Sequence, residues 1–170
     1  LQVLKEEWYV NGKNMIPERV EEAKQILREL HKEKAFISGS FLHAKEFNDI
    51  DMFIIGKRRR QYREGKKDFI YVTEEDLKKP QIYSALQYSI ANFLPNTIRP
   101  IIKRPEVEGI LFSYQLAIKE VLDNDDQKTI REILFVHCML TKKHILDSYE
   151  TYLTFEETKN KGAKKKIEYV

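Results

Sequence analysis

The sequence predicts an α/β fold of the α+β type, in which a short mixed β-sheet is flanked by helices and followed by a helical C-terminal part. Two observations support the sheet. Residues 35–38 form a short apolar run, and the segments 49–55 and 68–72 are rich in Ile, Phe and Val, which is typical of strands. A third observation supports the helices: apolar side chains recur at helical spacing in residues 20–30 and through most of the chain after residue 82.

Composition agrees with a folded, cytoplasmic protein. The chain has 170 residues, of which 42% are hydrophobic, enough for one compact domain or for a small α/β domain with a helical extension. Cys138 is the only cysteine, so no disulfide can form within the chain and a reducing compartment is expected. No apolar run is long enough to span a bilayer, and we expect no membrane partner.

We predict three parts: an α/β core in residues 1–78, a helical part in residues 79–154, and a basic, mobile tail in residues 155–170. In the core, Pro17 suits the first position of a helix, because its missing N–H is not needed there. A helical turn is expected near Phe41–Glu46. Thr73, with Asp76 three residues later, resembles a capping box that begins a short helix.

The helical part is predicted to contain three helices. The first runs from Ile82 to Leu94, where Pro95 would end it. Apolar spacing predicts a second helix over Val107–Val121 and a long third helix over Ile130–Tyr149.

Positive charge is concentrated in two segments. Residues 57–67 hold seven basic residues against one acid, and residues 159–166 hold five lysines and no acid. Such segments suit phosphate or nucleic acid, although a solvated hairpin and a frayed tail explain them as well.

The clearest chemical signal is a pair of carboxylates, Asp49 and Asp51. Alternation along a strand puts both on one face, about 7 Å apart by strand rise. Their charges repel, and a divalent cation would remove the conflict. Mg²⁺ takes carboxylates together with substrate phosphates. Asp68 opens the next strand and could complete the set, which suits two Mg²⁺ ions, with Mn²⁺ as an alternative.

A phosphate-binding element is expected just before this acid pair. Gly39 and Ser40 follow a strand and precede a helical turn, an arrangement that presents backbone N–H groups and one hydroxyl to an anion. Lys45 could also reach a triphosphate, although a solvated surface lysine is the simpler interpretation.

In this order, the three pieces resemble the nucleotidyltransferase superfamily that includes DNA polymerase β, and most closely its minimal nucleotidyltransferase branch. The residues that carry the resemblance are Ile37-Ser38-Gly39-Ser40, Asn48-Asp49-Ile50-Asp51-Met52-Phe53, and Asp68 to Leu77. The resemblance implies that Gly39 and Ser40 hold the triphosphate, that Asp49 and Asp51 bind two Mg²⁺, and that Asp68 helps to activate the acceptor. Asn48 departs from the family pattern, in which serine is common at this position.

The expected reaction is therefore transfer of a nucleoside monophosphate from an NTP, most naturally ATP, to a hydroxyl on protein, RNA or a small molecule. A prokaryotic enzyme with a toxin-like protein partner fits this branch. Two alternatives stay open. The fold could serve as a catalytically silent, antitoxin-like binding partner. The helical part could instead bind or cleave RNA, since Arg131 and His137 have the Arg-x5-His spacing of the HEPN ribonucleases.

Overall fold

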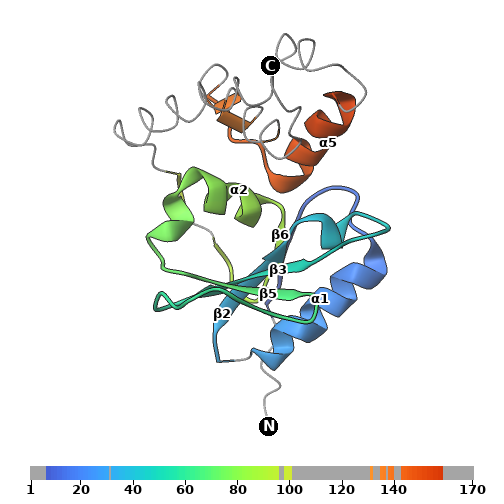
Figure 1. Cartoon of the computed structure of the whole chain (residues 1–170). Coiled ribbons are helices and arrows are strands. Elements are labelled where there is room, and N and C mark those ends of the chain that lie inside the picture. Colours follow the sequence, from blue (N-terminus) through green and yellow to red (C-terminus); the bar gives the residue numbers. More distant parts are fainter. Residues whose placement is uncertain are drawn as a thin grey trace. The chain divides into compact units, whose positions relative to one another are not determined.

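Figure 1 shows the computed structural model of the chain. The structure describes residues 7–30, 32–95, 98–100, 131, 135–136, 138–139 and 143–158. The chain divides into two compact units, Leu1–Pro100 and Ile101–Val170. The predicted α+β fold is confirmed, because the first unit is built around a mixed six-stranded sheet with helices packed on it.

The sheet has the strand order β1-β6-β2-β3-β5-β4. In chain order the strands are β1 (Tyr9–Asn11), β2 (Lys34–Ser38), β3 (Ile50–Ile55), β4 (Tyr62–Glu64), β5 (Lys67–Val72) and β6 (Ser89–Ala91). Only β3 and β5 pair in parallel, and every other neighbouring pair is antiparallel. The strands predicted near residues 35–38, 49–55 and 68–72 are therefore confirmed as β2, β3 and β5.

Helix α1 (Pro17–Glu29) begins at the predicted proline and buries Ala23, Ile26 and Leu27. Helix α2 (Pro80–Gln87) also begins at a proline. Both helices contact β2 and β6, and they lie on the two sides of the sheet (Figure 1). On the α2 side, the apolar core consists of Phe36, Phe53, Val72, Leu77, Ala85, Leu86 and Ala91.

The helix predicted over Ile82–Leu94 is wrong in its second half. Helix α2 ends at Gln87, and Ser89–Ala91 forms strand β6, which is buried between β1 and β2. A short apolar run is equally compatible with a buried strand and a buried helix, so its spacing cannot distinguish them. The predicted core boundary after residue 78 consequently falls inside the first unit, which extends to Pro100.

In the second unit, helix α5 (Ser148–Thr158) is preceded by residues 143–147, which have no regular structure. The long helix predicted over Ile130–Tyr149 is therefore wrong at its C-terminal end. Asp147 explains the break, because its Oδ1 accepts a hydrogen bond from the Glu150 N–H at 2.8 Å, while Glu150 Oε1 accepts one from the Asp147 N–H at 3.3 Å. This reciprocal pair is a capping box that starts a new helix.

The described residues include only part of the segments to which the other C-terminal predictions refer. The helix predicted over Val107–Val121 and the basic residues 159–166 lie outside the described residues. The predicted mobile tail begins at residue 155, but α5 continues to Thr158. None of the helices in the described segments combines the length and the hydropathy needed to cross a membrane.

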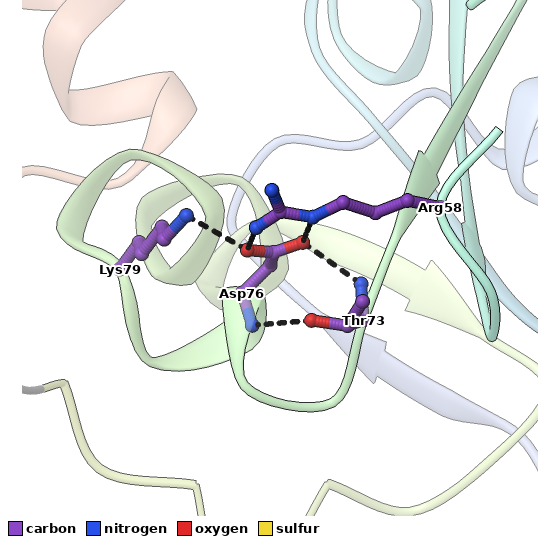
Figure 2. Close-up of polar contacts among 4 residues, drawn as sticks. All are labelled: Arg58, Thr73, Asp76 and Lys79. Carbon is purple, nitrogen blue, oxygen red and sulfur yellow. Dashed lines mark hydrogen bonds and ion pairs between the residues drawn. The ribbon is translucent and has the colours of Figure 1, made fainter. Parts of the chain in front are cut away.

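The connection from β5 to α2 is fixed by the buried carboxylate of Asp76 (Figure 2). Its N–H donates to Thr73 Oγ1 at 3.2 Å and its Oδ2 accepts from the Thr73 N–H at 2.9 Å, so the predicted capping box is present. Arg58 Nη2 and Lys79 Nζ bind Asp76 Oδ1 at 2.6 and 2.8 Å. Burial alone would raise the pKa of Asp76, but these hydrogen bonds outweigh it and hold the pKa well below its usual range.

We expect Asp76→Asn to lower the free energy of unfolding by about 2 kcal/mol at pH 7, because it weakens several hydrogen bonds to a charged group. Since folding lowers the pKa, the contribution of Asp76 is present above the usual carboxyl range near pH 4 and is lost as the pH falls below it. Urea unfolding at pH 7 and pH 3 should show a gap between wild type and variant that shrinks at pH 3. Glu75→Gln, at an exposed neighbour, should change stability by less than about 0.5 kcal/mol.

Candidate metal centre

A row of polar side chains crosses five strands of the sheet on the face that carries α2. Strand register aligns residues of β6, β2, β3, β5 and β4 in the order Ser89, Ser38, Asp51, Asp68 and Arg63. The next row on the same face is apolar and consists of Ala91, Phe36, Phe53 and Ile70. The polar row therefore borders the hydrophobic core directly.

The two serines of this row are bound to backbone carbonyls. Ser38 Oγ donates to the carbonyl oxygen of Tyr88 at 2.6 Å, and Ser89 Oγ donates to that of Leu86 at 2.7 Å. Because both serines are buried, these bonds satisfy groups that would otherwise be costly. The charged part of the row is thus confined to Asp51, Asp68 and Arg63.

The structure brings together the three acids predicted from the sequence. Asp49 immediately precedes β3, Asp51 lies two residues further along it, and Asp68 is the register partner of Asp51 on the parallel strand β5. One carboxylate oxygen from each residue lies within 4.8 Å of the others. Parallel pairing of β3 and β5 causes this convergence, because the two strands begin at the same end of the sheet.

The guanidinium of Arg63 lies among these carboxylates. Its Nε and Nη2 each donate to one oxygen of Asp68 at 2.6 Å, which makes a bidentate pair. Nη2 also donates to Asp49 Oδ2 at 3.2 Å. Planar pairing of this kind is among the strongest hydrogen-bonded ion pairs that a protein makes. A cation thus already bridges two of the three acids.

The three acids differ in their electrostatics. Burial, followed by repulsion from Asp49 and Asp68, raises the pKa of Asp51 to about 6, and Arg63 only partly offsets this. Hydrogen bonds from Arg63 lower the pKa of Asp68 despite its burial. The same bonds raise the pKa of Arg63, so it stays charged. Asp51 is therefore the carboxylate with an uncompensated negative charge near neutral pH.

This donor set fits a hard divalent cation. Mg²⁺ and Mn²⁺ prefer carboxylate oxygens, and three are available at one edge of the sheet. Neighbouring ligands of one Mg²⁺ lie about 3 Å apart at bond lengths of about 2.1 Å. The carboxylates would therefore hold such an ion after small side-chain movements. The position of the Arg63 guanidinium indicates that the cluster attracts positive charge.

The backbone of Gly39 lies close to the carboxylate of Asp51. It connects β2 to the short 3₁₀ helix η1 (Ser40–Leu42) with φ +91°, a conformation that side chains with a Cβ rarely adopt. A Cβ placed there would lie 3.0 Å from Asp51 Oδ2. The glycine therefore leaves a space beside the carboxylate that a side chain would fill.

Ser40 and Lys45, which the sequence also predicts to bind phosphate, are placed differently. Ser40 follows Gly39 directly, and its hydroxyl has no hydrogen-bond partner among the described residues. Lys45 is exposed in the loop between η1 and β3, and its side chain forms no ion pair with the described acids. Ser40 thus directly follows the glycine that lies against Asp51. Phosphate binding by Ser40 and by Lys45 stays a prediction.

The remaining candidate residues are not assembled into a second site within the described segments. Arg58, one of the basic residues expected near phosphate, is bound to Asp76 instead. Arg131 is exposed and helical, whereas His137 lies outside the described residues. The Arg-x5-His alternative therefore stays a prediction.

Sequence reasoning does not single out Arg63. A signal is present in Glu64-Gly65-Lys66-Lys67, where Gly65 has φ +61° and Glu64 pairs with Lys67 across a two-residue hairpin turn. That turn aligns Arg63 with Asp68. From the sequence, Gly65 suggests only a turn between two strands. In the structure, this turn also sets the register of the edge strand β4 against β5.

Comparisons with protein-family models, curated proteins and solved structures found no match to this chain. The assignment of a function therefore depends on the geometry of the site.

Proposed function

We propose that the chain is a divalent-metal-dependent nucleotidyltransferase, which transfers a nucleoside monophosphate from an NTP to a hydroxyl acceptor. One observation carries the proposal: carboxylate oxygens of Asp49, Asp51 and Asp68 converge within 4.8 Å beside the glycine bend at Gly39. An acid cluster that borders an open backbone bend suits a cation and a phosphate chain together.

Each residue has a distinct role in this proposal. Asp49 and Asp51 would hold the cation, which would supply Lewis-acid chemistry to the phosphates and to the acceptor hydroxyl. Gly39 and Ser40 bind the triphosphate tail through backbone N–H groups and the Ser40 hydroxyl. Asp68 completes the ligand set and orients the acceptor.

The reaction is an in-line displacement at the α-phosphorus. The acceptor oxygen forms a bond to that phosphorus, the bond to the bridging oxygen of the β-phosphate breaks, and pyrophosphate leaves with the electron pair. The acceptor proton passes to Asp68 or to water held beside it. The protein contributes positioning and charge stabilisation, which dominate catalysis of phosphoryl and nucleotidyl transfer.

The direct test is incubation of the protein with Mg²⁺, a cell extract and ATP labelled either at the α- or at the γ-phosphate. We expect label from the α-phosphate, and not from the γ-phosphate, to become covalently attached to an acceptor. Glu74→Gln is a matched control, because this exposed carboxylate lies at the opposite end of the strands and pairs only loosely with Lys34 at 3.8 Å. Labelling that is absent in wild type, or that survives in Asp51→Asn, would contradict the proposal.

A catalytically silent binding protein is the second candidate. The observation in its favour is the Arg63 ion pair, which neutralises Asp68 and part of Asp49 without any metal. Such a protein would bind a partner equally well with and without Asp51→Asn, and it would transfer no α-label. The labelling experiment therefore distinguishes the two candidates.

A further inference from the structure

The guanidinium of Arg63 binds two of the three acids that would hold a metal, Asp68 and Asp49. Both oxygens of Asp68 accept hydrogen bonds from the guanidinium at 2.6 Å, and Asp49 Oδ2 accepts one at 3.2 Å. A guanidinium and a divalent ion are both positive, so they repel one another when they share these carboxylates. Arg63 and a divalent ion therefore compete for the same acids.

The side chain of Arg63 can leave without disturbing the core. Strand β4 is at the edge of the sheet, and all three of its residues are exposed. The Arg63 side chain is itself 54% exposed, whereas that of Asp68 is 12% exposed. Rotation about side-chain bonds is enough to release the guanidinium into solvent.

The released guanidinium would face the phosphates from the side opposite Gly39. In the sheet, β2 and the Gly39 bend lie on one side of Asp51, while β5 and β4 lie on the other. A phosphate chain bound over the carboxylates would thus lie between the glycine bend and Arg63. The planar fork of arginine suits phosphate oxygens as well as it suits carboxylates.

We propose that Arg63 is a resident counter-ion, which the divalent metal displaces from the three acids and which then binds the phosphate tail of the nucleotide. This inference rests on the proposed function and adds a residue to its site. It also gives the protein a metal-free resting state in which the acid cluster is neutralised by the chain itself.

The first test measures Mn²⁺ affinity of the full-length protein by the electron paramagnetic resonance signal of the free ion. We expect Arg63→Gln to bind Mn²⁺ on the order of tenfold more tightly than wild type, because no internal cation competes. Arg60→Gln is the matched control. It removes the same charge from the same basic segment, where Arg60 pairs with no described acid, and should change affinity less than about twofold.

The outcomes separate this inference from the proposed function. Binding that is lost in Asp51→Asn but unchanged or weakened in Arg63→Gln would overturn the role of Arg63 and leave the metal site standing. If wild type shows no Mn²⁺ binding that is lost in Asp51→Asn, both the role of Arg63 and the proposed metal site are wrong.

A second measurement uses wild type and so does not depend on the folding of a variant. Phenylglyoxal modification, mapped by mass spectrometry, should increase at Arg63 when Mn²⁺ is added and decrease again when a non-hydrolysable ATP analogue follows. Reactivity of Arg60 should stay constant through the series. If the reactivity of Arg63 does not change with Mn²⁺, the metal does not displace Arg63 from the acids. If it does not change with the nucleotide analogue, Arg63 does not bind the phosphates.

Discussion

Asp51→Asn should reduce transfer of the nucleoside monophosphate about a thousandfold or more while leaving the fold intact. In the proposed mechanism the half-buried carboxylate of Asp51 is the metal ligand nearest the glycine bend, and an amide is a much weaker ligand for Mg²⁺. A thousandfold loss corresponds to about 4 kcal/mol of transition-state stabilisation, which is in the range that one metal ion supplies. Steady-state rates with Mg²⁺ and ATP, compared with Glu74→Gln, measure the effect.

The same variant should stabilise the metal-free protein near neutral pH. Folding raises the pKa of Asp51 to about 6, chiefly through burial, so the folded state binds more protons than the unfolded state between about pH 4 and pH 6. Stability is therefore lost as the pH rises through this window, and the full penalty applies above it. Thermal unfolding in EDTA should show a higher Tm for Asp51→Asn at pH 7.5 and no gain at pH 4. A lower Tm at pH 7.5 would contradict this account of the acid cluster.

Gly39→Ala should weaken both the folded state and the transfer reaction. At φ +91° an alanine is strained, and its Cβ would lie 3.0 Å from Asp51 Oδ2. We expect unfolding to become easier by about 1–3 kcal/mol and transfer to fall more than about a hundredfold, because the carboxylate must move away from the bend.

Gly56→Ala is a control with the same chemical change. Gly56 follows β3 at its other end, and a Cβ added there meets nothing within 4 Å. It should unfold and react like wild type. Equal behaviour of the two glycine variants would show that the bend at Gly39 has no special relation to Asp51.

Much of the sheet could be predicted because its central strands carry local signals. Strands β2, β3 and β5 are apolar runs with clear ends, and the two-residue spacing of Asp49 and Asp51 is by itself enough to place both acids on one face. The proline at position 17 likewise fixes the beginning of α1. These signals depend on a few neighbouring residues, which is why the sequence alone reveals them.

The three short strands could not be predicted in the same way. β1, β4 and β6 have three residues each, too few to display a period of two. Ser89–Ala91 becomes a strand because β1 and β2 pair with it from both sides, and such long-range pairing has no local mark. Tertiary context decided its conformation.

The three acids of the candidate site could be predicted from the sequence, whereas the arginine that binds two of them could not. Asp49, Asp51 and Asp68 are close in the sequence, and strand alternation with one parallel pairing suffices to bring them together. Arg63 reaches them only through the hairpin register that Gly65 sets. An arginine in a run of bases gives no sign by itself of which acid it will meet.

The most direct test of the proposed metal centre is diffraction from crystals grown with Mn²⁺ and a non-hydrolysable ATP analogue, recorded where manganese scatters anomalously. We expect an anomalous peak about 2.2 Å from carboxylate oxygens of Asp49 and Asp51, with the phosphates beside Gly39 and the Arg63 guanidinium withdrawn from Asp68. If saturating Mn²⁺ produces no peak there and Arg63 still bridges Asp68 and Asp49, the proposed metal centre is wrong.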